Sequence, residues 1–413
     1  MRMVAQVARI ALLCILSAPA AFAFGQNAVH MPITSRAQLD HYLKTVPPGT
    51  SPLDKFSPGA RKRFLAELEF GSHGLRGIPL AEPTHELTHP QVVALFSLFG
   101  VEKYAQGLGL APAERARRQH ERVAAAKVRG CKVDACPQSA IEKAFDQLIL
   151  HADPGSSSLP ERAAATAHAY DRLFTRYQKP SSLPNVDAPD LRLLKRAAEN
   201  VLFYAPDAAR IESLRNDLIE MHKRGMTTDE SYTKLYRALV ATRQFRQARA
   251  LARNHPGLSV APLPVFREPA RLPPGQPTAL SLGDDGKSMT RQAFDLDTSL
   301  RIVIVASCHF SKDAARAIKQ DPQLQPLFAR HAIWLADQSE PIANVEDWNR
   351  EFPDQPIHIA WQNSEWSKLD SWGMPTFYIF RHGKLVDQWH GWPADTGMQT
   401  LRRHLHEDGI QSP

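Results

Sequence analysis

The chain is 413 residues long, enough for two or three domains, and its 50 Lys and Arg against 43 Asp and Glu give a formal net charge of +7. This charge is mild for the length, and no long basic block with interleaved aromatic residues occurs, so the composition argues against nucleic-acid binding. All seven tryptophans lie beyond residue 330, which indicates that the C-terminal part is built differently from the rest.

The first 23 residues are typical of a secretory signal peptide. Arg2 and Arg9 supply the positive end, residues 10–18 supply a short apolar stretch, and Ala21-Phe22-Ala23 fits a small-x-small cleavage site. The stretch is too short for a membrane span, and no second apolar run of about 18 residues follows. We therefore expect removal of residues 1–23, export across the inner membrane to the periplasm, and no stable membrane span.

Cysteine usage points to one disulfide and one free thiol. Cys14 would leave with the signal peptide, and an oxidising compartment favours pairing among the three cysteines that remain. Cys131 and Cys136 lie between two helical patterns, the second expected to begin at Cys136-Pro137, so a disulfide there would staple a helix–loop–helix corner. Cys308 is then the free thiol. Alternatively, Cys131 or Cys136 acts as a resolving thiol across domains.

Residues 24–255 are expected to form an α-helical domain, because apolar positions recur at helical spacing and no clear strand pattern interrupts them. Residues 229–256 resemble one tetratricopeptide-like helix pair closed by Pro256, although a generic antiparallel helix hairpin is the preferred interpretation. The expected helices cover residues 35–45, 58–70, 90–99, 113–128, 137–151, 160–177, 190–204, 208–223 and 229–253.

The segment His85-Glu86-Leu87-Thr88-His89 matches the pattern of zinc proteases. That chemistry needs both histidines on one face of a single helix. Prolines flank the segment at 83 and 90, and a residue before a proline avoids helical geometry. We therefore expect Thr88 or His89 to cap a helix that starts at Pro90. The sequence predicts neither a metal site nor a cofactor.

A proline-rich passage at 256–280 cannot sustain a helix and is expected to be a semi-extended linker. Strands and helices alternate beyond it, which predicts an α/β domain with a mixed sheet over residues 281–413. The expected strands are 301–306, 332–336, 357–361, 376–380 and 385–389, and the expected helices are 309–320, 345–351, 365–369 and 396–406. The fold class expected for the chain is therefore an all-α region followed by an α/β domain.

Cys308 is the strongest candidate for a reactive residue. It follows the apolar run 302–306 and opens the tetrad Cys308-His309-Phe310-Ser311 at a helix start. Unsatisfied N–H groups and the helix dipole at such a position favour the thiolate, which is the nucleophilic form. His309, if protonated, would favour it further, and Ser311 can donate a hydrogen bond to the sulfur one turn away.

Residues 301–411 resemble a thioredoxin-fold domain. Three features match in order: the strand–Cys308-x-x-Ser311–helix junction, the segment Gly373-Met374-Pro375-Thr376-Phe377 where the family has its cis-proline, and the turn at 380–384 followed by Gly391. The resemblance implies thiol–disulfide chemistry on protein or peptide clients that carry cysteines. It also implies that Met374 and Pro375 hold the extended client.

Two departures from that family limit the expected activity. Ser311 replaces the second cysteine, so an attack on a disulfide stops at the mixed disulfide until another thiol arrives. Ile302 stands where many thioredoxins carry a buried acid. Cys-His-Phe-Ser also resembles the Cys-Gly-Phe-Ser of monothiol glutaredoxins. We expect monothiol exchange, isomerase-like or client-trapping. The alternative is a non-catalytic binding module whose helical domain recruits a protein partner.

Overall fold

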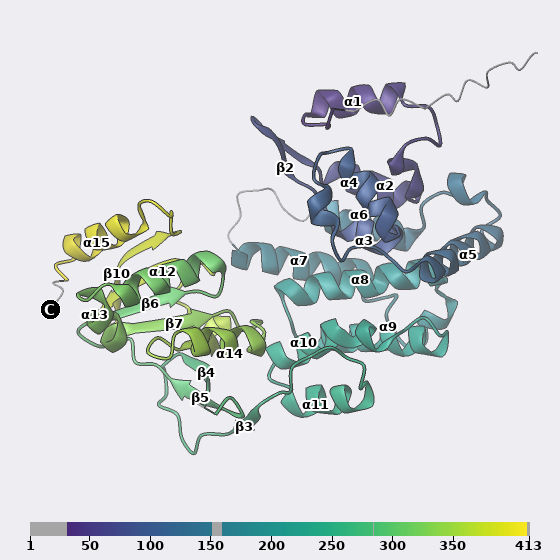
Figure 1. Ribbon diagram of the computed structural model, residues 1–413. Coiled ribbons are helices and arrows are strands. Elements are labelled where there is room, and N and C mark those ends of the chain that lie inside the picture. Colours follow the sequence, from purple (N-terminus) through teal and green to yellow (C-terminus); the bar gives the residue numbers. More distant parts are fainter. Residues whose placement is uncertain (1–30, 151–158, 284, 411–413) are drawn as a thin grey trace, which may run out of the picture. The chain divides into compact units, whose positions relative to one another are not determined.

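The computed structural model describes residues 31–150, 159–283 and 285–410, so the expected signal peptide lies outside the described residues. Within these ranges, no helix is both long enough and apolar enough to cross a membrane. The chain divides into two compact units, the first comprising residues up to 56 together with 68–111, and the second comprising 57–67 together with 112 onward (Figure 1).

The first unit is mainly helical. A β-hairpin interrupts it, which the sequence did not indicate; Gly74 closes its turn at φ +120°, a backbone angle that favours glycine. Its elements are α1 (Arg36–Thr45), η1 (Pro52–Lys55), β1 (Glu69–Gly71), β2 (Gly74–Gly77), α3 (Ala81–Glu86), α4 (His89–Ser97) and η2 (Glu102–Ala105). The expected helix at 58–70 therefore ends early, at Ala66.

The second unit contains α2 and, from residue 112 onward, the helices α5 to α11. Most lie within a few residues of their expected bounds, but α6 starts at Ala140 and not at Pro137, because Ser139 accepts the Glu142 amide at 2.8 Å. The elements are α2 (Pro58–Ala66), α5 (Pro112–Val128), η3 (Val133–Ala135), α6 (Ala140–Leu150), α7 (Leu159–Phe174), η4 (Leu183–Asn185), α8 (Ala188–Tyr204), α9 (Ala208–Lys223), η5 (Asp229–Tyr232), α10 (Thr233–Ala241) and α11 (Phe245–Asn254).

The C-terminal part of the second unit is a mixed sheet of eight strands in the order β10-β9-β6-β7-β8-β4-β5-β3. Strands β6, β7 and β8 are parallel, whereas β9 is antiparallel to both β6 and β10. The strands are β3 (Val265–Arg267), β4 (Thr278–Leu282), β5 (Ser288–Ala293), β6 (Arg301–Val305), β7 (Ala332–Ala336), β8 (Ile357–Ala360), β9 (Thr376–Arg381) and β10 (Lys384–His390). The coarse fold class, helices followed by a mixed sheet, is confirmed.

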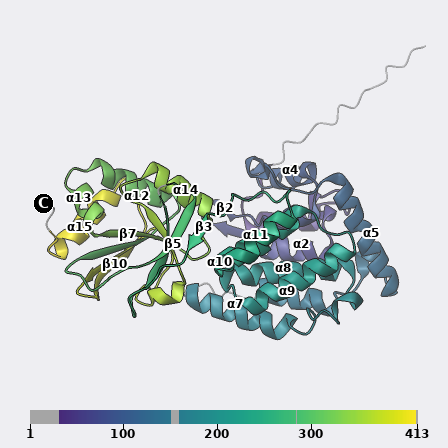
Figure 2. The ribbon, with the colours of Figure 1, turned by 90° about the horizontal axis from the view of Figure 1, so that it is seen from below.

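The two faces of this sheet are covered differently. Alternate strand residues such as Ile304 and Phe377 pack against α12 (His309–Gln320), α13 (Leu324–His331), α14 (Ile342–Glu351) and α15 (Gly397–Glu407). Figure 2 shows α12, α13 and α14 along one side of the sheet. The other face is covered by two loop segments, residues 294–296 and 366–372, which pack against Val305, Tyr378 and their neighbours. The second segment begins at the last residue of η6 (Asn363–Trp366).

The proline-rich passage does not behave as a linker throughout. It supplies strand β3, which pairs in parallel with β5, and the first residues of β4. Phe266 on β3 packs against Phe245 of α11 and Trp361, with ring centroids 5.2 and 5.6 Å apart. Packing of these aromatic rings against one another overrides the extended, unpaired conformation that proline content favours. The boundary expected at 256–280 thus lies inside one compact unit.

One arginine connects the helix hairpin α10–α11 to the end of β8. Arg243 adopts φ +62° after α10 and donates through Nε to the carbonyl oxygen of Trp361 at 3.0 Å, and through its guanidinium to that of Ala360. Burial lowers the pKa of Arg243 to about 10. The helical region therefore meets the sheet at β8 and β3, and this contact uses none of the residues of the Cys308 motif.

Candidate functional site

Cys308 lies at the junction between a buried strand and an amphipathic helix. Residues 302–305 of β6 are fully buried, so the chain is held in the sheet until Ala306. Cys308 is then the N-cap of α12, with extended backbone angles, and its carbonyl oxygen accepts the Lys312 amide at 3.1 Å. The side chain of an N-cap residue lies beside the unpaired N–H groups of the first helical turn.

The sulfur is half-buried and has two polar neighbours. Cys308 Sγ lies 3.3 Å from Ser311 Oγ and 3.5 Å from the carbonyl oxygen of Met374. Ser311 is fully buried, so its hydroxyl is oriented by the helix rather than by solvent. Within the described chain, Cys308 is the only cysteine outside a disulfide. The structure therefore brings together Cys308, Ser311 and Met374, three of the residues predicted to form the site.

The Met374–Pro375 peptide bond is cis, and it lies between Cys308 and the start of β9. Pro375 is buried while Met374 remains 40% exposed. Ser307 Oγ lies 3.0 Å from Met374 Sδ and donates to Glu340 Oε2 at 2.8 Å. Sequence inspection missed Glu340, because only the β7–α14 connection brings this carboxylate to the end of β6.

His309 and Phe310 follow Cys308 in the first turn of α12. Both are exposed, Phe310 by 47%, and their rings lie 3.8 Å apart between centroids. Among the described residues His309 makes no hydrogen bond to Cys308. The next cation on the helix, Lys312, donates to Glu351 of α14 at 3.0 Å and holds the pKa of that carboxyl below its usual range.

The segment before β9 is tied to the last two strands by polar side chains. Tyr378 Oη accepts the Ser371 amide at 2.9 Å and lies 2.9 Å from Asp370 Oδ1, and Gln388 Nε2 donates to Asp370 Oδ2 at 2.9 Å. These donors hold the pKa of Asp370 below its usual range, with the Gln388 bond the larger cause. The segment that leads to Met374 is therefore fixed by the side chains of Tyr378 and Gln388 as well as by the strand pairing of β9.

His390, at the end of β10, completes these contacts. Its Nδ1 lies 2.9 Å from Thr376 Oγ1, and Thr376 Oγ1 lies 2.6 Å from the Gly373 carbonyl oxygen. The sequence offered one signal for this residue, its position immediately before Gly391 at the end of the last strand. The pairing of His390 with Thr376 depends on strand register, which the sequence does not reveal.

The remaining sequence motifs lie elsewhere. Cys131 and Cys136 form a disulfide across η3, at the corner between α5 and α6. The His85–His89 motif is split between two helices, because α3 ends at Glu86 and Thr88 caps α4 with Gln91 in a capping box. Its histidines therefore do not share one helix face. Across the described ranges, no three acidic, histidine or cysteine side chains are grouped so that they could hold a metal ion.

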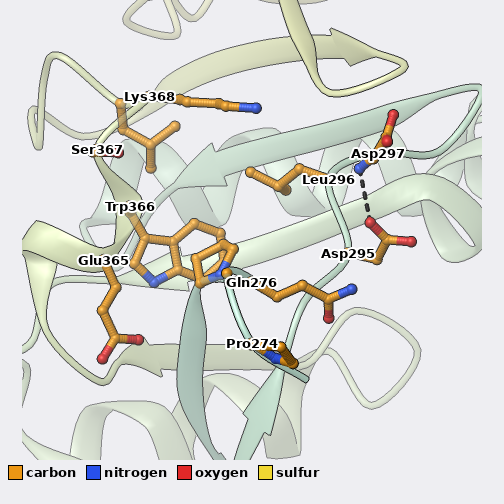
Figure 3. A pocket seen from close by; sticks show the side chains of 12 residues that line it. Pro274, Gln276, Asp295, Leu296, Asp297, Glu365, Trp366, Ser367 and Lys368 are labelled. Atoms are coloured by element: carbon orange, nitrogen blue, oxygen red, sulfur yellow. Dashed lines mark hydrogen bonds between the residues drawn. The ribbon is translucent and has the colours of Figure 1, made fainter. Parts of the chain in front are cut away.

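A cavity of about 410 Å³ opens on the sheet face that lacks helices (Figure 3). Its floor is formed by Trp366 and Leu296, and Asp295 and Lys368 lie at its rim. One carboxylate that lines the cavity, that of Glu365, already accepts hydrogen bonds from the Thr278 amide at 3.0 Å and from the guanidinium of Arg291 at 2.8 Å. The Glu365 carboxylate therefore stabilises the fold, and none of the lining residues belongs to the Cys308 site.

Comparison with known proteins adds no assignment. No protein-family model matches the chain, and no characterised protein and no solved structure shows significant similarity to it. Any function must therefore be argued from the geometry around Cys308.

Proposed function

We propose that this chain is an exported thiol–disulfide exchange protein that acts through Cys308, in a thioredoxin-like domain covering residues 281–413. The proposal is supported by the order of features along the chain: a buried strand, a cysteine at a helix start, and a cis-proline before the next strand. It is carried by one observation, the position of Cys308 Sγ between Ser311 Oγ and the Met374 carbonyl oxygen at the start of α12.

The start of α12 and the Ser311 hydroxyl stabilise a negative charge on the sulfur, whereas the Met374 carbonyl oxygen accepts a hydrogen bond from the neutral thiol. The amides of the first turn of α12 and the positive end of the helix dipole stabilise a negative charge at the N-cap position. Ser311 Oγ, at 3.3 Å, donates its proton to the sulfur once that sulfur is ionised. His309, in its protonated form, adds a positive charge on the next residue. All three act on the thiolate, which is the attacking species.

The reaction is a pair of thiolate–disulfide displacements. Cys308 S⁻ attacks one sulfur of a client disulfide, forms a mixed disulfide with it, and releases the client's other sulfur as a thiolate that takes a proton from water. A second thiolate, from the same client or from a small thiol, then attacks the client sulfur of the mixed disulfide and releases Cys308 S⁻. When the client supplies that thiolate, its disulfides are rearranged with no net oxidation or reduction.

The lack of a second cysteine sets the character of this cycle. Ser311 occupies the position from which a resolving thiol would attack, and Ile302, near the start of β6, is a fully buried apolar residue. The mixed disulfide therefore persists until an outside thiol arrives. This behaviour suits isomerisation or trapping of clients with cysteines, held in extended form beside Met374 and Pro375.

Alkylation of the intact protein tests the proposal. Iodoacetamide should label Cys308 in the folded state at neutral pH, and replacing Ser311 by Ala should slow labelling by about tenfold through loss of a hydrogen bond to a charged group. The Cys308→Ala variant is the control for labelling elsewhere. On non-reducing gels, the wild type should accumulate mixed disulfides with a cysteine-containing client, and Cys308→Ala should not.

The opposite outcome is equally clear. Labelling that requires denaturant would contradict exchange chemistry, because the thiol would then be a buried structural residue. The chain would in that case be better described as a binding module that presents its helical region to a protein partner.

A further inference from the structure

We propose that His390 is a positioning residue for this site, and that its Nδ1–H holds the Met374–Pro375 backbone against Cys308 through Thr376. His390 lies on β10, opposite Thr376 in the strand pairing. It does not touch the sulfur. The proposal rests on the exchange reaction only for its kinetic consequence, whereas the hydrogen bond at its centre can be tested independently.

The hydroxyl of Thr376 has two partners and one proton. Thr376 Oγ1 lies 2.6 Å from the Gly373 carbonyl oxygen and 2.9 Å from His390 Nδ1. A carbonyl oxygen can only accept, so the hydroxyl proton is used toward Gly373. The imidazole must then donate from Nδ1 to the oxygen of Thr376. This assigns His390 the Nδ1–H tautomer when the ring is neutral.

This hydrogen bond belongs to a set of contacts that fixes the backbone facing Cys308. Three successive carbonyl oxygens before β9 are each engaged: that of Gly373 by Thr376 Oγ1 at 2.6 Å, that of Met374 by Cys308 Sγ at 3.5 Å, and that of Pro375 by the Gly391 amide at 2.8 Å. His390 and Gly391 thus hold the residues on either side of Met374. Its carbonyl oxygen is left to face the sulfur.

The surroundings of His390 support a donor role. Thr376 is fully buried, so its oxygen has no solvent to replace a missing donor. The stacked pair Phe377 and Trp389, with ring centroids 4.7 Å apart, fixes the neighbouring register of β9 and β10. His390 itself is exposed, so the register of its strand is what places the imidazole beside Thr376.

The hydrogen bond can be tested in the wild-type protein by NMR. Long-range ¹H–¹⁵N correlation on the neutral ring should show a protonated Nδ1 and an unprotonated Nε2 for His390, with His390→Asn identifying the signal by its loss. A predominant Nε2–H form would overturn the proposal, whether or not Cys308 proves reactive. A failure of the proposed function is recognised separately, by an unreactive Cys308.

Its consequence is tested with three variants. His390→Leu and Thr376→Val remove the donor and the hydroxyl, whereas His390→Asn keeps an N–H donor close to the position of Nδ1. Exchange with a synthetic disulfide-bonded peptide should slow by about tenfold in the first two variants and recover in the third, while iodoacetamide labelling of Cys308 should change by less than about twofold in all three.

The two rates separate positioning from a general structural role. A peptide has to align beside Met374, whereas iodoacetamide needs only an exposed thiolate. Equal loss of both rates, no loss of peptide exchange in His390→Leu, or no recovery in His390→Asn would each overturn the proposal. If a variant does not fold, the tautomer measured in the wild type still decides whether Nδ1 is the donor.

Discussion

Cys308 Sγ lies 3.5 Å from the carbonyl oxygen of Met374, although 66 residues separate them in the chain. Strand β9 pairs antiparallel with β6, so the end of β6 and the start of β9 lie side by side, and Cys308 follows the one while Met374 precedes the other. The proposed nucleophile and the backbone proposed to hold its client therefore lie next to the ends of two adjacent strands of one sheet.

A second sulfur at position 311 should convert the site to dithiol chemistry. Ser311 Oγ already faces Cys308 Sγ at 3.3 Å, so Cys in its place could attack a mixed disulfide and release the client. In Ser311→Cys, mixed disulfides on non-reducing gels should fall by roughly an order of magnitude. Ser307→Cys is the matched control, since Ser307 faces Glu340 and Met374 Sδ. Equal accumulation in both variants would contradict the site geometry.

Loss of Arg243 should destabilise the second unit. Its guanidinium donates to the carbonyl oxygens of Ala360 and Trp361, which would be left without these donors in Arg243→Ala. The free energy of unfolding in urea should fall by about 2–4 kcal/mol, as for other buried charged groups whose hydrogen bonds are removed. Arg246→Ala, an exposed change on the same hairpin, should leave stability within about 0.5 kcal/mol. A similar loss in both variants would show that Arg243 has no special role.

Asp217 should make stability depend on pH. Burial raises the pKa of this carboxyl well above its usual range, and its Oδ1 has no hydrogen-bond partner within the described chain, while Gln178 donates to Oδ2 at 2.6 Å. The folded state therefore binds the proton more tightly than the unfolded state does. The contribution of Asp217 to the free energy of unfolding is fully present below the pKa of the unfolded state, about 3.9. It is lost as the pH rises through the higher pKa of the folded state.

Asp217→Asn removes that dependence while keeping an acceptor for Gln178. The free energy of unfolding at pH 7 should rise by about 1 kcal/mol, and the difference from wild type should vanish near pH 4. Thermal unfolding at both pH values measures this change. A variant less stable than wild type at pH 7 would show that the ionised carboxylate is needed in the folded protein.

The disulfide should contribute to stability without taking part in exchange. Cys131 and Cys136 are five residues apart, and closing so short a loop stabilises a fold by at most about 2 kcal/mol. Replacing both by Ser should lower the melting temperature modestly and leave labelling of Cys308 unchanged. A longer-lived mixed disulfide in this variant would instead show that one of the pair serves as a resolving thiol.

The sequence by itself determined the elements that carry the proposed chemistry. Strand, helix and turn signals depend on neighbouring residues, so they can be recognised in the sequence alone. These signals identified the apolar run before Cys308, the helix after it and the Met374–Pro375 segment. The spacing of Cys131 and Cys136 likewise suggested their pairing. The hairpin β1–β2 and the strands β3, β4 and β5 were missed, because short strands are stabilised by partners distant in sequence.

Only the tertiary structure decided which side chains meet at the site. Glu340, in the connection between β7 and α14, accepts a hydrogen bond from Ser307. His390 lies opposite Thr376 because a β-bulge between Leu385 and Asp387 shifts the register of β10 by one residue. Without that bulge Trp389 would lie opposite Thr376, since a one-residue slip turns every side chain to the other face. A bulge is a property of the paired strands and their packing, so the sequence of one strand does not determine it.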